Sequence, residues 1–290
     1  MSAPVCLIVN PSAGGGRTAR LLPAVEVALR GHGLGFRVEP THSLDHAREL
    51  ARSAVEAGEV SAAMGGDGLI GAVAGELRGT PGVLAVLPGG RGNDFARKLG
   101  VGTDPVAACD VVAEGVQRRI DVADLEGRAY LGIASAGLDS DAGDIANATR
   151  LRLGRLVYLY ATLRALRAWR PARWGVVIDG EHHSFTGYSV AVANSGVFGG
   201  GMFLAPEARL DDGLLDVVLV HDVPKRRYLA TLPKVFTGAH VHADALEFLR
   251  GREIAFDADR PFAVHADGDP IAELPASVRV QPGALRVLTR

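Results

Sequence analysis

Cysteine is scarce in this sequence, and its scarcity removes two classes of protein. The 290 residues include two cysteines, Cys6 and Cys109, and both stand in apolar stretches. They are interpreted as buried thiols, too few for a disulfide framework or a cysteine-based zinc site. The nine histidines also lack the spacing of zinc ligands. We therefore expect neither a disulfide-stapled domain nor a zinc protein.

Long apolar runs and an excess of one charge are also missing. No stretch approaches the roughly 20 apolar residues of a membrane span. The apolar run Val5–Val9 is too short for a signal peptide and lacks a basic lead. The formal net charge of −2 argues against a general nucleic-acid-binding surface. We expect a cytoplasmic protein, long enough for two domains, that touches a membrane only through a local patch.

Glycine is plentiful, and three glycine-rich loops follow apolar runs in the first third of the chain. Glycine allows close backbone approach and positive φ, and a helix N-terminus behind such a loop attracts anions. Carboxylates in two of the loops would repel a phosphate unless a cation lies between them, which indicates Mg²⁺. The loops are Asn10-Pro11-Ser12-Ala13-Gly14-Gly15-Gly16-Arg17, Gly65-Gly66-Asp67-Gly68 and Pro88-Gly89-Gly90-Arg91-Gly92-Asn93-Asp94.

One glycine turn of this kind most often has only a structural role. Three of them, after strands that alternate with helices, favour a common anion site, because parallel strands end at one edge of a sheet. Arg17 and Arg91 offer guanidinium groups to the same anion. The sequence as far as about Asp124 therefore predicts an α/β domain with a parallel sheet and helices on both faces.

After Asp124 the pattern changes to strand-like runs, with a hairpin turn at Asp179-Gly180. This pattern predicts an antiparallel second domain, with a helix over Tyr228–Thr237. The expected strands are Ala129–Ala134, Trp174–Ile178, Ser184–Ala193, Leu214–Val220, Glu253–Phe256, Phe262–His265 and Ser277–Val280.

The segment from Arg150 to Trp174 carries seven arginines and no acid, mixed with leucines, tyrosines and tryptophans. Arginine beside Trp and Tyr suits an anionic membrane surface. The same composition fits a solvated helix that packs through its leucines, and the sequence does not separate these two interpretations.

Taken together, the motifs resemble those of the diacylglycerol kinase catalytic-domain family, in its bacterial lipid-kinase branch. The resemblance covers nearly the whole chain, and the order of the motifs makes it specific. Besides the three loops, the matching stretches are Phe95-Ala96, Asp121–Asp124, Gly199-Gly200-Gly201-Met202, Ala205-Pro206-Glu207-Ala208, Asp211-Asp212-Gly213-Leu214-Leu215-Asp216 and Asp267-Gly268-Asp269.

The resemblance implies a nucleotide-binding α/β domain over residues 1–124, completed by a strand at 281–290, and a β-rich lipid-substrate domain over 125–280 with a cleft between them. It implies Mg²⁺-dependent transfer of the ATP γ-phosphoryl group to a hydroxyl of diacylglycerol or a related lipid. It implies ATP contacts by Asn10, Pro11, Gly14, Gly15, Gly16, Arg17, Thr41, Gly65, Gly66, Asp67, Gly68, Arg91, Gly92 and Asn93. It further implies metal contacts by Asp94 and Asp124 and catalytic roles for Asp67 and Asp269.

This chain departs from the family pattern at several positions. Leu69 stands where a threonine usually follows Gly-Gly-Asp-Gly, Gly71-Ala72 replaces an Asn-Glu pair, and Arg91 replaces another threonine. Asp269 replaces the glutamate of Asp-Gly-Glu, and we interpret it as the general base. Near the Asp-Asp-Gly-Leu turn the family can hold a structural Mg²⁺. Arg209 stands at one of its ligand positions, so we expect no metal there and an ion pair between Arg209 and Asp212.

Two other functions remain open at this point. One is a kinase of soluble substrates from the wider NAD kinase-like superfamily, which shares the Gly-Gly-Asp-Gly turn. The other is a catalytically impaired homologue that binds nucleotide or lipid, which Leu69, Ala72 and Asp269 would favour. The sequence does not name the lipid, and it leaves a homodimer open; it predicts no nucleic-acid partner.

Overall fold

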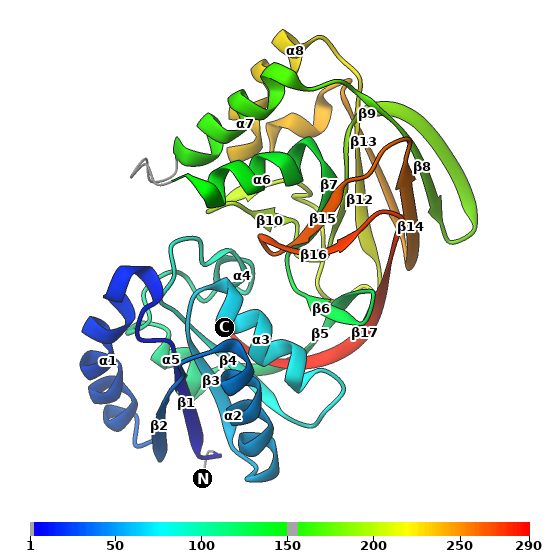
Figure 1. The fold of residues 1–290 in the computed structure, drawn as a ribbon. Helices are drawn as coiled ribbons and strands as arrows, with labels where there is room; N and C mark the ends of the chain where they lie inside the picture. Colours follow the sequence, from blue (N-terminus) through cyan, green and yellow to red (C-terminus); the bar gives the residue numbers. More distant parts are fainter. Residues whose placement is uncertain (1–2, 150–155) are drawn as a thin grey trace. The chain divides into compact units, whose positions relative to one another are not determined.

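The computed structural model describes residues 3–149 and 156–290 (Figure 1). The chain forms two compact units: unit 1 runs up to Val122 and includes Pro282–Arg290, and unit 2 comprises Ala123–Gln281. Within the described ranges, no helix has the length and apolar character needed to cross a bilayer. Each unit is described separately below.

Unit 1 is built on a parallel sheet with the strand order β17-β4-β3-β1-β2. Helices α1 and α5 cover one face and α2 and α3 the other (Figure 1). Because both faces are covered, the inner strands β1, β3 and β4 are largely apolar, and β1 is buried along its whole length, whereas the edge strand β2 carries Arg37 and Glu39 and is only partly buried. The elements of unit 1 are β1 (Val5–Val9), α1 (Ala13–Gly31), β2 (Phe36–Pro40), α2 (Leu44–Glu56), β3 (Val60–Gly65), α3 (Asp67–Leu77), β4 (Val83–Pro88), α4 (Asp94–Lys98) and α5 (Cys109–Glu114).

Local sequence explains where two of these helices begin. Ser43 caps α2, since its hydroxyl accepts a hydrogen bond from the His46 amide at 3.0 Å. In α1 the residues Gly14, Gly15 and Gly16 have φ of 60°, 67° and 82°, so the regular helix starts only after them. The glycines therefore form a loop, as the sequence predicted, even though they lie within the bounds of α1.

Unit 2 is antiparallel and strand-rich, with β5 and β17 shared between the two units. Its strand order is β16-β15-β7-β9-β8-β14-β17, and β12 pairs with both β9 and β13. The first half of the long strand β9 pairs with β8, whereas its second half pairs with β7 and β12. The strands are β5 (Val116–Leu125), β6 (Arg128–Tyr130), β7 (Ile133–Gly137), β8 (Ala172–Ile178), β9 (Glu181–Ala193), β10 (Val197–Phe198), β11 (Met202–Phe203), β12 (Leu215–His221), β13 (Leu246–Gly251), β14 (Glu253–Ala258), β15 (Ala263–Ala266), β16 (Asp269–Glu273) and β17 (Ala276–Thr289).

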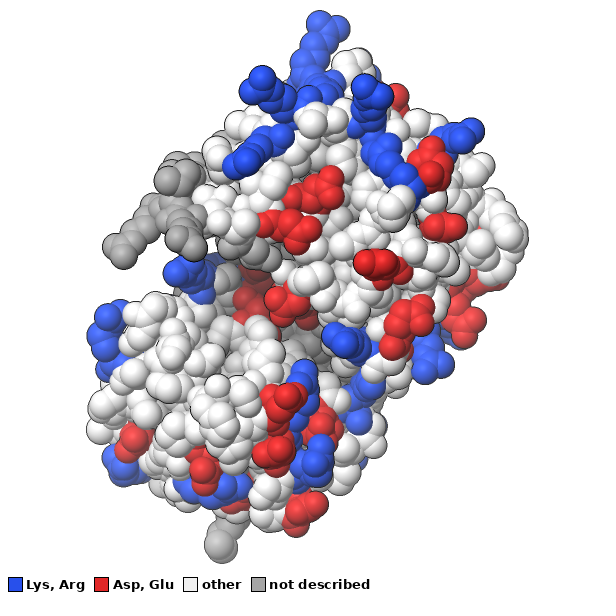
Figure 2. Space-filling view, in the orientation of Figure 1, with Lys and Arg blue, Asp and Glu red and all other residues white. Residues whose placement is uncertain are grey.

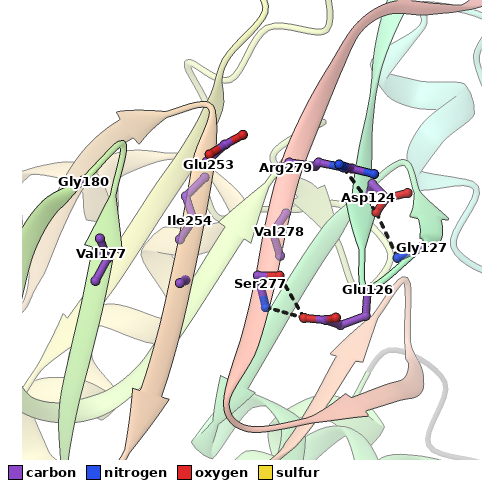
Figure 3. Close-up of a pocket in the computed structure, with 11 residues that line it drawn as sticks. Asp124, Glu126, Gly127, Val177, Gly180, Glu253, Ile254, Ser277, Val278 and Arg279 are labelled. Carbon is purple, nitrogen blue, oxygen red and sulfur yellow. Dashed lines mark hydrogen bonds and ion pairs between the residues drawn. The ribbon is translucent and has the colours of Figure 1, made fainter.

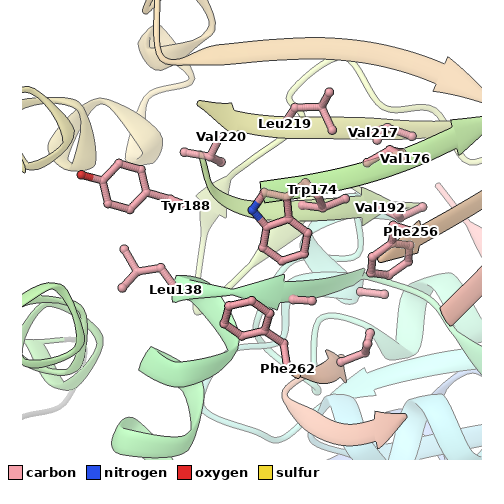
Figure 4. Packing of buried hydrophobic residues seen from close by; sticks show 14 of the residues in the cluster. Leu138, Trp174, Val176, Tyr188, Val192, Val217, Leu219, Val220, Phe256 and Phe262 are labelled. Carbon is pink, nitrogen blue, oxygen red and sulfur yellow. The ribbon is translucent and has the colours of Figure 1, made fainter. Parts of the chain in front are cut away.

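The core of unit 2 is packed around aromatic rings (Figure 4). Trp174 is 2% exposed and stacks on Phe262 with ring centroids 5.2 Å apart. Trp169, beyond the end of a helix, stacks on the same ring at 5.5 Å. The helices of unit 2 are α6 (Leu138–Ala148), α7 (Leu156–Ala168) and α8 (Lys225–Thr231), followed by the 3₁₀ turns η1 (Leu232–Phe236) and η2 (Ala239–His242). Of the arginine-rich segment, residues 150–155 lie outside the described ranges and the rest begins with α7.

Two elements of unit 2 differ from their predictions. The single strand expected over Ala129–Ala134 is wrong, because the chain turns at Leu131-Gly132 and forms β6 and β7 instead. The helix expected over Tyr228–Thr237 begins earlier, at Lys225, and changes to a 3₁₀ turn at Leu232. Pro233 explains that change, since it has no amide to donate to an α-helical carbonyl.

Candidate active site

Four segments expected at a nucleotide site follow neighbouring parallel strands of unit 1. Asn10–Arg17 follows β1, Thr41 follows β2, Gly65–Leu69 closes β3, and Gly89–Asp94 follows β4. Because parallel strands end at the same edge of a sheet, these segments share one edge. The fold of unit 1 therefore brings its three glycine-rich loops together.

Glycine allows the backbones of the three loops to touch. A Cβ atom on Gly14 would lie 2.5 Å from the carbonyl oxygen of Gly89, and one on Gly90 would lie 2.5 Å from the Cα of Gly66. The Gly89 amide also donates to the Gly65 carbonyl oxygen at 2.7 Å. Larger residues would force the loops apart, so this packing depends on glycine.

Asn93 closes the third loop and joins it to the second. Its side chain accepts a hydrogen bond from the Gly90 amide at 2.8 Å and donates one to the Gly90 carbonyl oxygen at 3.1 Å. Its φ of 54° is left-handed, a conformation that asparagine adopts more readily than most residues. The Asn93 amide donates to Asp67 Oδ2 at 3.0 Å, which fixes the position of that carboxylate.

Asp67 is the first residue of α3, and one oxygen of its carboxylate is buried without a hydrogen-bond donor in the part of the chain that the structure describes. Oδ1 is buried and has no hydrogen-bond partner within the described residues. Burial raises the pKa of the Asp67 carboxyl, while the backbone amides of Phe95, Asn93 and Asp94 oppose the rise. A buried carboxylate oxygen without a donor is costly unless a cation or a ligand group completes it.

Asp94, the first residue of α4, brings a second carboxylate close to Asp67. A Cβ atom on Gly92 would lie 3.0 Å from Asp67 Oδ2 and 3.3 Å from Asp94 Oδ2, so both carboxylates approach the same point. Mg²⁺ is commonly held by one or two carboxylates together with substrate phosphates. In the part of the chain that the structure describes, no cluster of three His, Cys, Asp or Glu side chains could hold a metal. Two carboxylates that approach one point fit an ion that is shared with a phosphate ligand.

The two arginines expected to face an anion have different environments. Arg17 donates from Nη2 to the carbonyl oxygen of Thr103 at 3.2 Å, so its guanidinium is already anchored to unit 1. Arg91 is exposed at the tip of the third loop. Of the two, Arg91 has the greater freedom to reach a ligand.

The side chains of Asn10, Thr41 and Leu69 support the backbone of this edge. Asn10 Oδ1 accepts from the Ser12 amide at 3.1 Å, and Thr41 Oγ1 donates to the Ser43 carbonyl oxygen at 2.6 Å. Leu69 is 2% exposed and packs against Gly65. Position 69 therefore supplies an apolar contact inside unit 1 and no hydroxyl to this edge.

In unit 2, Asp267 lies in a two-residue hairpin turn and Asp269 directly follows that turn, but the two side chains have opposite environments. Asp267 and Gly268 have φ of 52° and 95° and connect β15 to β16. The Asp267 carboxylate accepts hydrogen bonds from the amides of Leu131 and Gly132 at 2.9 and 2.8 Å. Asp269 is exposed at the start of β16. Asp267 is thus engaged in holding the turn between β6 and β7, whereas Asp269 is accessible.

Asp124 also lies in unit 2, and its carboxylate holds the turn after β5. Oδ1 accepts from the Gly127 amide at 2.9 Å and lies 3.8 Å from Nε of Arg279. Asp124 and Arg279 line a groove of about 500 Å³, and Figure 3 shows these two side chains close together. The groove is lined by Asp124, Glu126, Gly127, Val177, Gly180, Glu253, Ile254, Ala255, Ser277, Val278 and Arg279. These contacts give Asp124 a structural role, and its expected role as a metal ligand stays a prediction.

The ion pair expected between Arg209 and Asp212 is wrong. Arg209 pairs instead with Asp211 at 3.3 Å, where both side chains are exposed. The cation beside Asp212 is Arg250 from β13, whose Nη1 lies 3.9 Å from Asp212 and whose Nε donates to Asp216 at 2.9 Å. Arg250 also donates to the Glu207 carbonyl oxygen at 3.2 Å. The Arg250 guanidinium therefore lies among the carboxylates of Asp212 and Asp216 and the carbonyl oxygen of Glu207. The hydrogen bond with Asp216 raises the pKa of Arg250.

Arg250→Ala should lower the free energy of unfolding by about 1–3 kcal/mol, because the 5%-exposed Asp216 would lose its charged donor. Arg209→Ala is the matched control and should change stability by less than about 0.5 kcal/mol, since exposed ion pairs contribute little. Urea denaturation measures both. Added EDTA should not shift the wild-type curve; a shift would mean that a metal, and not Arg250, neutralises this cluster.

Sequence reasoning missed the roles of Asp267 and Arg250. Their partners, Leu131 and Asp216, stand 136 and 34 positions away in the sequence. The one available signal was Asp267-Gly268, a dipeptide typical of tight hairpins. It could have separated a structural Asp267 from an accessible Asp269.

Comparison with known proteins agrees with this architecture. Residues 4–125 match the model of the diacylglycerol kinase catalytic domain, and residues 132–289 match the YegS C-terminal NAD kinase beta sandwich-like domain. A diacylglycerol kinase of Mycobacterium tuberculosis is 32% identical over 98% of this chain and 94% of its own length. A YegS-like lipid kinase of Chromohalobacter salexigens is 31% identical over 93% of this chain and 89% of its own.

Solved structures show the same fold. One, described as a diacylglycerol kinase from Bacillus anthracis, has a TM-score of 0.77 and 20% identity over 99% of this chain and 97% of its own. Another chain from the same organism reaches a TM-score of 0.83 at 23% identity, with the same coverage. The chain belongs to the diacylglycerol kinase family, and it is an enzyme of the lipid kinase class.

Proposed function

We propose that this protein transfers the γ-phosphoryl group of ATP to a hydroxyl of diacylglycerol or a closely related lipid, with Mg²⁺ as cofactor. The observation that carries the proposal is the edge of unit 1 where three glycine loops meet around Asp67, whose Oδ1 is buried and without a partner. The similarity to lipid kinases over nearly the whole chain supports the choice of acceptor.

Phosphoryl transfer depends mainly on positioning and on neutralising charge, and unit 1 offers both. The backbone amides of Gly14, Gly15, Gly66, Gly68 and Gly92 would hold the phosphates, with Arg17 and Arg91 as cationic contacts. Asp67 and Asp94 would hold Mg²⁺ between them and the phosphates. The ion, when bound, offsets the negative charge of the transferring group.

The acceptor hydroxyl also needs a base, because its pKa lies far above neutrality. We assign this role to Asp269. Its carboxylate is exposed, whereas the oxygens of Asp267 already accept two backbone hydrogen bonds. Asp269 would accept the hydroxyl proton as the new phosphorus–oxygen bond forms.

A single assay tests this function: transfer of labelled phosphate from ATP to a panel of lipids in mixed micelles, with NAD as a soluble acceptor. We expect labelled phospholipid from a diacylglycerol and none from NAD, and EDTA should abolish the product. Labelling of NAD would instead support the soluble-substrate alternative, and no labelling of any acceptor would support a binding protein without activity.

We further propose that α7 contacts an anionic membrane surface, since its segment contains arginines and no acid. Arg164→Glu with Arg167→Glu should weaken binding to phosphatidylglycerol vesicles by about 10-fold or more at low salt, because each lost charge counts for about 1 kcal/mol. Co-sedimentation measures the effect, and 0.5 M salt should remove it. Equal binding by wild type and variant would leave α7 as a solvated helix.

A further inference from the structure

Two phenylalanine side chains of unit 2 are exposed to solvent. Phe203 in β11 is 40% exposed and Phe236 in η1 is 44% exposed. The two elements are in contact, and Gly238, just beyond η1, packs on Pro206, just beyond β11. Two exposed aromatic side chains, on a strand and a 3₁₀ turn that are in contact, favour a surface that meets something apolar.

The chain around Phe236 is basic. Between Pro224 and Ala243 it carries Lys225, Arg226, Arg227 and Lys234 and no acidic residue, although Arg227 pairs with Asp244 just beyond this stretch, at 3.6 Å. Lys225 donates to the carbonyl oxygens of Leu166 and Arg167, which joins this segment to the end of α7. Figure 2 shows Lys and Arg side chains gathered at the end of unit 2 that carries α8. Aromatic rings and positive charge thus share one region.

We propose that Phe203 and Phe236 insert into the interfacial layer of an anionic bilayer, while Arg226 and Lys234 contact its headgroups. Aromatic rings favour the level of the headgroups, where the ring is removed from water, and basic side chains beside them are attracted to anionic lipid. This inference rests on the proposed function in one respect: a lipid acceptor resides in a bilayer. It goes further by naming a second contact, apolar and separate from the arginines of α7.

The test is flotation of the full chain with vesicles of 30% phosphatidylglycerol in phosphatidylcholine, without nucleotide. Phe203→Ser with Phe236→Ser should weaken binding by about 10-fold or more, because two partly inserted rings are lost. Arg226→Gln with Lys234→Gln should weaken it to a similar extent at low salt and much less at 0.5 M salt. The effect of the phenylalanine pair should persist at 0.5 M salt, since apolar insertion is not screened.

The matched control is Val27→Ser with Val116→Ser, which removes two apolar side chains that are 66% and 59% exposed in unit 1. It should leave vesicle binding unchanged, and thermal melting verifies that every variant folds. Wild-type-like binding by a folded phenylalanine variant would overturn the proposal. So would a change from dimer to monomer in that variant with vesicle binding intact, which would make the surface a contact between two copies.

Flotation without nucleotide also separates this proposal from the proposed function. Loss of vesicle binding in the phenylalanine variant supports insertion whether or not the wild type phosphorylates a lipid. If the wild type phosphorylates micellar diacylglycerol but the phenylalanine variant floats normally, only the insertion proposal fails.

Discussion

Asp269→Asn should lower the rate of lipid phosphorylation by about 10²–10⁴-fold, the usual contribution of a positioned general base. Asparagine is almost the same size but does not accept the hydroxyl proton. Because Asp269 is exposed at the start of β16, the change should leave folding and the affinity for MgATP as they are. The measurements are initial rates on micellar diacylglycerol, thermal melting, and titration with MgATP.

Asp267→Asn is the matched control for this prediction, because Asp267 lies two residues from Asp269 in the turn of the same hairpin. It keeps one carbonyl oxygen but loses the second acceptor that holds the Leu131 and Gly132 amides, so its main effect should be a loss of stability. We expect a fall of about 1–3 kcal/mol in the free energy of unfolding. Full turnover in Asp269→Asn, together with a folded but inactive Asp267→Asn, would move the base to Asp267.

Asp67→Asn should remove the thermal stabilisation that MgATP gives to the wild type. A ligand that binds only the folded state raises the melting temperature in proportion to the logarithm of its concentration over its dissociation constant. Without the Asp67 carboxylate, the pair around Gly92 loses one of its two anionic groups, and the proposed Mg²⁺ would lose a ligand. Differential scanning fluorimetry over a range of MgATP concentrations measures this loss, and an unchanged shift would remove Asp67 from the nucleotide site.

The same substitution should make the unliganded protein more stable at neutral pH. Burial raises the pKa of Asp67 above its ordinary value of 3.8, so the folded state binds a proton more tightly than the unfolded state does. The stability from this group is complete below pH 3.8 and is lost as pH rises through the folded pKa. Asparagine has no charge to bury, so its advantage over wild type should vanish as the pH falls toward 3.8.

The sequence was most informative where neighbours along the chain determine the structure. The apolar runs of β1, β3 and β4 are buried on both faces. The loops after them contain glycines because their backbones approach one another closely at the candidate site. Ser43 caps α2 through a residue three positions away. Signals of this kind are local, and local patterns are the part of a fold that one sequence exposes.

Where distant segments decide the structure, the same reasoning failed. Leu131-Gly132 lies in a run that looks like one strand, but the amides of both residues donate hydrogen bonds to the Asp267 carboxylate, which holds the chain in a turn there. Arg209 stands three positions before Asp212, yet Arg250 from the distant strand β13 lies beside Asp212 instead. Strands β13 and β16 were missed, and the glycines, alanines and acids of α6 lack a clear apolar stripe.

Strand β17 has a consequence for how the protein acquires its structure during synthesis. Its residues Arg286 and Val287 pair with β4. The sheet of unit 1 therefore combines a segment that precedes unit 2 in the sequence with one that follows it. At roughly 5–20 residues per second, a ribosome needs about 10–30 s to make the segment 123–281 that separates them. Throughout that time the edge of β4 lacks its partner, while the contiguous unit 2 becomes complete first. A released chain truncated after Gln281 should therefore protect unit 2 from protease and leave unit 1 sensitive.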